Sequence, residues 1–503
     1  MAEQAEVIVI GAGIGGLTAA ALLQERGLAT LVFEKNGFPG GSCSSFSRNG
    51  YTFDAGASVF YGFSGDERSG TLNLHTRIFR KLGEHVATVP DPVQIHYHLP
   101  NGFDIAAEYD RQAFLDALAE RFPEEREGIG KFYRELEEVY DILSSLPAGS
   151  LEDVMHLASV GGRYPWKTVI LALKTFRSMG KTARKYIRNE ELLRFIDIES
   201  YSWAVQDAVS TPLVNAGICL ADRHHGGINY PVGGSGSIPA ALVRGFEKFG
   251  GTVRYREEVT GIVVENGEAR GVRLSSGEVV CARAVITNAT VWDTFNRMVS
   301  DSRYRVPEDL FLRAPSWFQL FLGVDGRVIP PGFNVHHILV DDWKTYNTLG
   351  GTIYFSAPTI LDPSLAPPGK HVVHAFVTSE TTRWDQHERG SEAYRQAKDR
   401  YARSIIARTE RILPGLAGAV ELKVLATPQT HERYLNRWKG SYGALLKPGQ
   451  NILRKPQNMT MVKNLYATGD STFPGQGVIA VTYSGVSCAS MVARKLGKPL
   501  EYL

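Results

Sequence analysis

The stretch EVIVIGAGIGGLTAAALLQERGLATLVFE, residues 6–34, decides the fold. Its β-branched start, Glu6–Ile10, predicts a buried strand, and the glycine-rich Gly11–Gly16 predicts a tight turn. Apolar residues then recur at helical spacing over Leu17–Arg26, until a glycine ends the helix. A second short apolar run, Ala29–Phe33, completes a strand–turn–helix–strand unit. Such a unit is typical of an α/β fold with a parallel sheet.

The turn fits the pattern G-x-G-x-x-G, in which each glycine has a physical task. Gly11 permits the tight turn, Gly13 lets a pyrophosphate approach the backbone, and Gly16 lets the helix pack against the strand. Glu34 ends the second strand, where its carboxylate can accept hydrogen bonds from a ribose. The pattern therefore predicts a dinucleotide site formed by Gly11, Ala12, Gly13, Ile14, Gly15, Gly16 and Glu34.

Two further glycine-rich segments distinguish FAD from NAD. The segment Phe38–Ser42, FPGGS, would extend the contact beyond the ribose. Near the other end of the chain, YATGD at residues 466–470 places Gly469 and Asp470 after a strand, and FPGQGVIA at residues 473–480 places Gly477 before a helix. That helix N-terminus can face a flavin ring and stabilise negative charge on it. An NAD enzyme does not need this second site, so we expect FAD.

Composition restricts the function classes. The chain has 503 residues, which is too long for one compact core, and its formal net charge of +2 gives no general case for nucleic acid. Four widely separated cysteines argue against disulfides and zinc clusters and favour a reducing compartment. We see no signal or transit peptide and no apolar run of about 18 residues, so we expect a cytoplasmic protein without a transmembrane helix.

The middle of the chain changes character twice. Helical, charge-rich patterns occupy residues 109–146 and 169–187. Short strands separated by Asn266-Gly267 and Ser276-Gly277, both hairpin signals, are expected at Thr252–Arg256, Gly261–Glu265, Ala269–Leu274 and Glu278–Cys281, with a further strand at Val285–Thr287. A second sheet is expected from Trp317–Val324, Val335–Leu339 and Thr352–Ser356.

These patterns divide the chain into three parts. We expect a Rossmann-type FAD-binding domain assembled from residues 1–90, 241–295 and 441–503. An inserted α+β substrate-binding domain is expected over 296–440, and a helical, membrane-associating lobe over 91–240. Inserting lobes between the halves of a nucleotide domain forms a pocket that faces the cofactor.

Several motifs together resemble one family. VIVIGAGIGGL, EKNGFPGGS and ATGDSTFPGQGV are similar to the FAD superfamily of amine oxidases and carotenoid desaturases. The interior motifs DPVQIHYHLPNG, DRHHGGINYPVGGSG, TNATVWDTF, TILDPSLAP and GQGVIAVTYSG resemble its carotenoid isomerase branch, which acts on prolycopene. The resemblance extends over about residues 5–495. It implies FAD contacts at Glu34, Lys35, Gly41, Ser42, Val259, Asp470, Val478 and Ile479.

The resemblance implies an enzyme that converts a poly-cis carotene to the all-trans form, using reduced FAD without net oxidation. A flavin carotenoid or retinoid desaturase or saturase on the same scaffold is the alternative. A lipid-carrying escort protein without flavin chemistry is the third hypothesis, although such a protein would not need an intact dinucleotide site. The electron donor for the flavin is left unassigned.

Other side chains could take part in chemistry. Arg223 and His224 are candidate catalytic residues, and the competing interpretation is a hydrogen-bonded cluster that steadies a turn. His96 and His98 share one face of an extended run, but a third ligand is not evident, so no metal site is predicted. Aromatic residues suited to lining a polyene pocket are Tyr61, Phe63, Tyr201, Trp203 and Tyr483.

The segment from Gly161 to Arg188 contains eight basic residues and no acidic ones. On one helix, basic residues would share a face at Lys174, Arg177, Lys181, Arg184 and Arg188. Apolar residues would share another at Val169, Leu173, Phe176, Ala183 and Ile187, with Trp166 at the start. A basic amphipathic helix suits an anionic lipid surface, so we expect peripheral membrane binding; the alternative is an ordinary solvated helix face.

Overall fold

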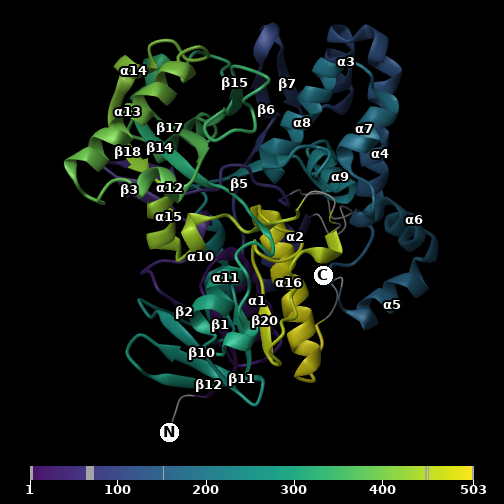
Figure 1. Cartoon of the computed structure of the whole chain (residues 1–503), viewed down its shortest axis with the longest axis vertical. Helices are drawn as coiled ribbons and strands as arrows, with labels where there is room; N and C mark the ends of the chain where they lie inside the picture. Colours follow the sequence, from purple (N-terminus) through teal and green to yellow (C-terminus); the bar gives the residue numbers. More distant parts are fainter. Residues whose placement is uncertain (1–3, 64–72, 151, 448–449, 451, 501–503) are drawn as a thin grey trace.

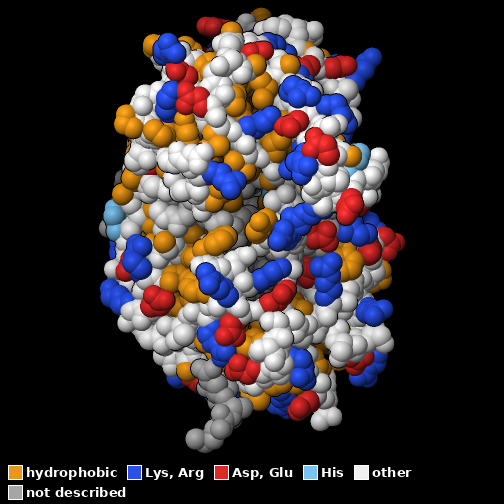
Figure 2. All heavy atoms as spheres, turned by 90° about the vertical axis from the view of Figure 1, so that its left-hand side faces the viewer, with side chains coloured by type: hydrophobic (Ala, Val, Ile, Leu, Met, Phe, Trp, Pro, Cys, Tyr) orange, Lys and Arg blue, Asp and Glu red, His pale blue; other side chains and the backbone are white. Residues whose placement is uncertain are grey.

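A computed structural model describes residues 4–63, 73–150, 152–447, 450 and 452–500. Two seven-stranded sheets, three two-stranded ones and a group of helices form the described part of the molecule. Figure 1 shows the first large sheet at one end, and the second large sheet and most helices toward the other. On the face drawn in Figure 2, basic and acidic side chains are interspersed rather than gathered by sign. None of the helices in the described part of the chain has the length and apolarity needed to cross a bilayer.

The first sheet has the strand order β10-β11-β12-β1-β2-β9, with β20 added beside β12. Strand β1 is parallel to both β2 and β12, whereas β10, β11 and β12 form an antiparallel meander. The bounds are β1 Gln4–Ile10, β2 Thr30–Glu34, β9 Thr252–Tyr255, β10 Val259–Glu265, β11 Glu268–Leu274, β12 Val279–Thr287 and β20 Leu465–Ala467. Segments from both ends and the middle of the chain thus build one nucleotide domain.

Both faces of this sheet are buried, which explains the unbroken apolar run of β1. Val7 and Val9 face one hydrophobic cluster, while Ile8 and Ile10 face another. Helix α1 (Ile14–Glu25) packs against both α10 (Ser237–Lys248) and α16 (Val478–Lys495). The first and last helices of the nucleotide domain are therefore neighbours.

The second sheet has the order β18-β14-β17-β16-β15-β6-β7. The bounds are β6 Val93–His98, β7 Asp104–Glu108, β14 Ser316–Asp325, β15 His336–Val340, β16 Thr352–Ser356, β17 Lys370–Ser379 and β18 Val420–Ala426. Its buried side chains pack with those of α12 (Thr381–Trp384), α13 (Glu392–Thr409) and α14 (Leu416–Ala419), and α15 (Pro428–Leu435) lies beside β14 and β18. Smaller pairs are β3 (Ser45–Arg48) with β4 (Tyr51–Asp54), β5 (Thr88–Asp91) with β8 (Ile228–Pro231), and β13 (Leu312–Arg313) with β19 (Ala444–Leu445).

The helical region gathers most of the remaining helices around its own apolar core. Figure 1 shows α3, α4, α7, α8 and α9 together, with α5 and α6 projecting at the side of the molecule. The bounds of these helices are α3 Arg111–Arg121, α4 Arg126–Ser144, α5 Val154–Arg163, α6 Pro165–Thr175, α7 Met179–Tyr186, α8 Glu190–Ala204 and α9 Leu213–Asp222. Outside this region, α2 (Leu74–Leu82) lies beside α10 and α16, and α11 (Val291–Asp293) packs in the core of the first sheet.

Most predicted strands are present, and the hairpin signals work as expected. Asn266 and Gly267 both have positive φ, 52° and 80°, as a tight β10–β11 turn requires. The two strands expected at Glu278–Cys281 and Val285–Thr287 are instead the single strand β12. It runs without a break because its first part pairs with β11 and its second with β1 and β20.

The domain boundaries differ from the expected ones in two places. Strands β6 and β7 lie in the second sheet, although their residues fall within the range 91–240 assigned to the helical lobe. Helix α10 begins at Ser237 and packs on α1, so the nucleotide domain resumes before residue 241. Long-range strand pairing decides the first boundary and helix packing decides the second, and composition reveals neither.

The prediction of a helix over residues 169–187 is wrong, because α6 ends at Thr175 and α7 begins at Met179. The Ser178 side chain caps α7 by accepting the Lys181 N–H at 3.3 Å. Next to it, the Met179 N–H donates to the Thr211 carbonyl at 2.9 Å, which holds the break against a neighbouring segment.

Candidate functional site

A cavity of about 1030 Å³ begins at the glycine turn and extends into the helical region. Of the predicted cofactor contacts, Ala12 and Gly16 are not at its wall. The contacts that do line it are Gly11, Gly13, Ile14, Gly15, Glu34, Lys35, Gly41, Ser42, Val259, Gly469, Asp470, Gly477, Val478 and Ile479. Residues far apart in the sequence thus face one space.

Backbone contacts hold the first glycine turn beside the FPGGS segment. The Gly40 N–H donates to the Ala12 carbonyl at 2.8 Å, and Gly13 forms an isolated bridge with Gly40. A Cβ on Gly16 would overlap the Gly11 carbonyl oxygen, so this glycine allows the turn to close on α1. Gly16 therefore shapes the site by packing, which explains why it lies behind the wall.

Two helix N-termini meet at the cavity. Helix α1 begins after Gly13 and α16 after Gly477, and no described side chain caps either end. The first-turn N–H groups of a helix have no partner within the helix and carry partial positive charge. The N-terminus of α1 suits a pyrophosphate, and the N-terminus of α16 suits the electron-rich part of a flavin ring. The residues present therefore fit FAD.

Glu34 is nearly buried at the end of β2 and organises the loop around it. One carboxylate oxygen accepts the Ala12 N–H at 2.8 Å, and the other accepts both the backbone N–H and the side-chain amide of Asn36, at 2.8 and 3.0 Å. Burial raises the pKa of Glu34, against the lowering effect of these bonds. Each carboxylate oxygen has two lone pairs, so acceptor capacity toward a ribose remains on the oxygen bonded to Ala12.

Arg437, which the sequence did not single out, joins two predicted contacts. Its guanidinium forms an ion pair with Asp470 and donates to the Ser42 hydroxyl at 3.3 Å. It also lies 4.5 Å from the centre of the Tyr442 ring. Burial alone would lower the pKa of Arg437, but Asp470 and Tyr442 keep it raised. A permanent, partly buried cation thus links the FPGGS turn to the C-terminal segment.

Asn288 is a second residue that sequence reasoning missed. A Cβ on Gly13 or on Gly469 would overlap the Asn288 side-chain amide. Asn288 also lines the cavity and follows β12 directly. Its position after the carboxyl end of a parallel strand was the available signal, because ligands bind at that edge of such sheets.

Beyond the glycine turns the cavity wall becomes mostly apolar. Of the aromatic residues proposed from sequence, Tyr61, Trp203 and Tyr483 line it. Phe63 instead stacks on His75 at 4.6 Å between ring centres, and Tyr201 packs edge-on against Tyr346. The apolar wall residues of α4, α5, α6 and α9 include Leu143, Leu157, Val160, Leu171, Ala172, Val214 and Ile218, and Phe176 directly after α6 lines the wall as well.

Several polar side chains interrupt the apolar wall, among them Gln94, Asn215, Gln319 and His336. Gln319 Oε1 and His336 Nε2 are buried and have no hydrogen-bond partner among the described residues. Burial lowers the pKa of His336 to about 3, so the ring is neutral near pH 7. A substrate in this part of the cavity would meet these two unpaired groups as well as the other polar side chains of the wall.

Arg223 and His224 do not line the cavity. Arg223 is fully buried and pairs with Glu199 at 2.7 Å, and it donates to Gln94 Oε1 at 3.2 Å. His224 accepts from Arg223 Nε at 3.0 Å, and burial together with that charge lowers its pKa to about 3. Their catalytic role stays a prediction; the contacts favour an indirect effect through Gln94, which does reach the cavity.

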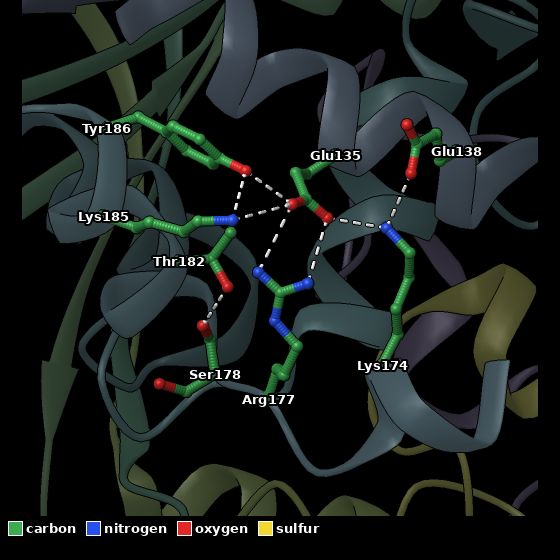
Figure 3. Close-up of polar contacts among 8 residues, drawn as sticks. All are labelled: Glu135, Glu138, Lys174, Arg177, Ser178, Thr182, Lys185 and Tyr186. Atoms are coloured by element: carbon green, nitrogen blue, oxygen red, sulfur yellow. Dashed lines mark hydrogen bonds and ion pairs between the residues drawn. The ribbon is translucent and has the colours of Figure 1, made fainter. Parts of the chain in front are cut away.

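The predicted basic face is not on the surface as a unit. Figure 3 shows Lys174, Arg177 and Lys185 converging on Glu135 of α4, and Lys174 also contacts Glu138. The hydroxyl of Tyr186 donates to Glu135 as well, at 2.8 Å. Desolvation would raise the pKa of Glu135, but these donors lower it to about 2. The cations therefore hold α6 and α7 against α4.

The apolar half of the predicted amphipathic surface divides in two. Ala183 and Ile187 are buried, whereas Trp166, Leu173 and Phe176 are exposed by 79%, 70% and 67%. With neighbours on α5 they form an exposed apolar surface, called here the α5–α6 patch, made of Val154, Met155, Leu157, Trp166, Val169, Ile170, Leu173 and Phe176. Leu157 and Phe176 also line the cavity, so the patch borders one of its mouths.

Comparison with known proteins gives three kinds of match. The family described as flavin containing amine oxidoreductase matches residues 14–493. The chain is 42% identical to a chloroplastic prolycopene isomerase of Daucus carota, over 98% of this chain and 80% of that one. It is 26% identical to a neurosporene-forming phytoene desaturase of Cereibacter sphaeroides, over 99% of this chain and 97% of that one. The fold is similar to an oxidoreductase from Methanosarcina mazei, with TM-score 0.62, 19% identity and coverage of 96% and 99%.

Proposed function

The chain belongs to the flavin containing amine oxidoreductase family, and from that membership we propose that it is an FAD-dependent carotenoid cis–trans isomerase. It would convert a poly-cis carotene of the prolycopene kind to the all-trans form, using reduced flavin. The relatives named as isomerases are 41–42% identical to this chain, against 26–27% for those named as desaturases. That difference favours the isomerase over the desaturase or saturase.

One observation carries the proposal: the glycine cradle and the apolar chamber are parts of a single cavity. An escort protein would need the chamber but not the cradle, with its two uncapped helix ends and the partly buried Arg437–Asp470 pair. An amine oxidase would need the cradle, but its charged substrate would not match a wall formed by Leu143, Leu171 and Val214. A long hydrocarbon matches both parts.

The protein's own residues position the substrate and set the environment of the reaction. When bound and reduced, FAD provides an electron or a proton that can lower the bond order of a polyene and be recovered. The chain keeps water out through the apolar wall, and the N-terminus of α16 stabilises negative charge beside the cavity. Trp203 and Tyr483 lie along the wall and can orient a flat conjugated chain.

We further propose that the α5–α6 patch rests on a lipid surface. A carotene dissolves in the bilayer and not in water, and the patch borders a mouth of the apolar chamber. Trp166 suits the interfacial zone of a membrane, while Arg163 and Lys181, both exposed, can meet anionic headgroups. Attachment through apolar side chains would leave the chamber open toward the lipid.

The decisive experiment supplies the purified flavoprotein with a poly-cis carotene under anaerobic conditions, with and without a reductant. Chromatography and absorption should show cis-to-trans conversion in the reduced sample alone, with an unchanged number of conjugated double bonds. A product that gains or loses double bonds in proportion to electrons passed to an acceptor would replace the isomerase with the desaturase or saturase.

A matched pair of variants tests whether the chamber admits the substrate. Ala172→Trp adds bulk at an exposed wall residue, whereas Ala158→Trp adds the same bulk on an exposed face of α5 away from the wall. We expect Ala172→Trp alone to lower kcat/KM, with FAD content unchanged in both. Equal activities would show that the substrate does not pass this mouth.

A further inference from the structure

Three histidines lie together on the second sheet, away from the dinucleotide cradle. His96 and His98 project from the same face of β6, because alternate residues of a strand share a face. Strand β15 pairs with β6 in parallel and places His337 opposite His96. The ring centres are 4.3 Å apart for His96–His98, 5.2 Å for His98–His337 and 5.6 Å for His96–His337. The third side chain that the sequence did not reveal comes from another strand.

Oxygen acceptors hold one N–H of each ring. Asp104, on the neighbouring strand β7, accepts from His96 Nε2 and from His98 Nδ1, both at 2.5 Å. The backbone carbonyl of Asn334 accepts from His337 Nε2 at 2.9 Å. In a neutral imidazole, a hydrogen on one nitrogen leaves a lone pair on the other. The lone pairs therefore lie on His96 Nδ1, His98 Nε2 and His337 Nδ1.

Two of those lone pairs face each other directly. His98 Nε2 and His337 Nδ1 are 2.9 Å apart, and the planes of the two rings are within 19° of parallel. Such an approach is repulsive unless a cation, either a proton or a metal ion, lies between the nitrogens. Two nitrogens bound at about 2.0–2.1 Å to one ion lie roughly 2.9–3.4 Å apart, so little movement is needed.

The surroundings favour a metal over a proton. Histidine ligands of metals usually donate their second N–H to a carboxylate or a backbone carbonyl, which fixes the ring and its tautomer. Asp104 and the Asn334 carbonyl supply that arrangement for all three rings. The amide of Asn334, which donates to His96 Nδ1 at 3.0 Å, would turn aside to admit an ion.

We propose that His96, His98 and His337 bind one divalent transition-metal ion of the zinc type, with Asp104 and Asn334 as positioning residues. The ion would fasten β6 to β15. His336, His337 and Ile338 of β15 all line the substrate cavity, so the ion would stiffen that part of the wall. Its role is structural and is independent of the flavin chemistry.

The test uses the full-length flavoprotein after treatment with a chelator and desalting. Titration with Co²⁺ should reach about one ion per chain and produce the visible absorption of a nitrogen-ligated cobalt site, which Zn²⁺ then displaces. His98→Gln should weaken Co²⁺ binding by at least about tenfold, and Asp104→Asn by about 10- to 100-fold. Both side chains are partly exposed, so the variants should fold, and FAD content verifies this.

His85→Gln is the control, because His85 is an exposed histidine outside the cluster. It should bind Co²⁺ as the unaltered chain does. In both proteins the affinity for Co²⁺ should fall below about pH 6, because the histidine ligands take up protons. The proposal is overturned if the unaltered chain and His98→Gln take up the same amount of Co²⁺ with the same spectrum, or if neither takes up any. A proton shared by His98 and His337 would then be the cation between the rings.

Discussion

The ammonium of Lys174 lies 2.6 Å from Oε2 of Glu135, and it contacts Glu138 at 2.9 Å as well. Only 7% of the Lys174 side chain and 13% of the Glu135 side chain are exposed. These contacts turn a cation that was expected to meet lipid headgroups inward, onto α4 (Figure 3). They also turn the opposite, apolar side of α6 toward solvent, where Leu173 lies.

Lys174→Met should destabilise the fold by about 1–3 kcal/mol, because it leaves Glu138 unpaired and Glu135 with fewer donors. Lys181→Met removes an exposed cation of the same shape and should change stability by less than about 0.5 kcal/mol. Urea unfolding at pH 7 measures both. Equal midpoints for the two variants would mean that the Lys174 contacts contribute nothing.

The same cluster predicts a pH dependence. The pKa of Glu135 falls from 4.5 to about 2 in the folded chain, so its contribution is complete above about pH 4.5 and is lost as the pH falls toward 2. Glu135→Gln should therefore lower the free energy of unfolding at pH 7 more than at pH 3. Unfolding curves of the variant and the unaltered chain at both pH values give the difference; a constant difference would contradict the assignment.

Leu173→Asn combined with Phe176→Asn should weaken binding to liposomes by about tenfold or more, because each side chain would otherwise bury apolar area in the interface. Leu310→Asn changes an exposed apolar residue outside the α5–α6 patch and should have no effect. Sedimentation with vesicles of phosphatidylcholine and phosphatidylglycerol measures the binding. If the double variant and the control sediment alike, the patch is not the membrane contact.

Gly13→Ala should abolish or greatly reduce bound FAD, since its Cβ would overlap the Asn288 amide and displace the turn. Gly161→Ala, which meets open space within α5, should keep the protein yellow. Adding Asn288→Ala to Gly13→Ala separates two causes. Recovery of FAD would show that Asn288 is the obstacle, whereas continued loss would mean that the Cβ intrudes on the pyrophosphate itself; full FAD binding by Gly13→Ala alone would contradict both.

Arg437→Met should lower FAD affinity by about 10- to 100-fold, because Asp470 loses its partner and the FPGGS turn loses its link through Ser42. Arg433→Met, at an exposed position on α15, is the matched control. Fluorescence titration of the cofactor-free chain with FAD measures the affinity. An unchanged affinity in Arg437→Met would assign this residue to packing alone.

Local sequence patterns were enough for the first part of the nucleotide domain. Residues 6–34 contain a strand, a glycine turn and a helix in one continuous segment, and the positive φ of Gly11, 91°, meets a requirement that only glycine satisfies without strain. The hairpin at Asn266 and Gly267 was predictable for the same reason. In each case the residues that determine the conformation are neighbours in the chain.

What remained hidden depended on contacts between distant segments. Arg437 joins Ser42 to Asp470, and His337 joins His96 and His98, across sequence separations that no local pattern records. The amphipathic pattern of residues 169–187 was present in the sequence, but Glu135 decided which side of α6 faces inward. A sequence pattern states which side chains share a face, whereas the tertiary structure decides which face is buried, because burying a charge is favourable only where a partner of opposite sign is already placed.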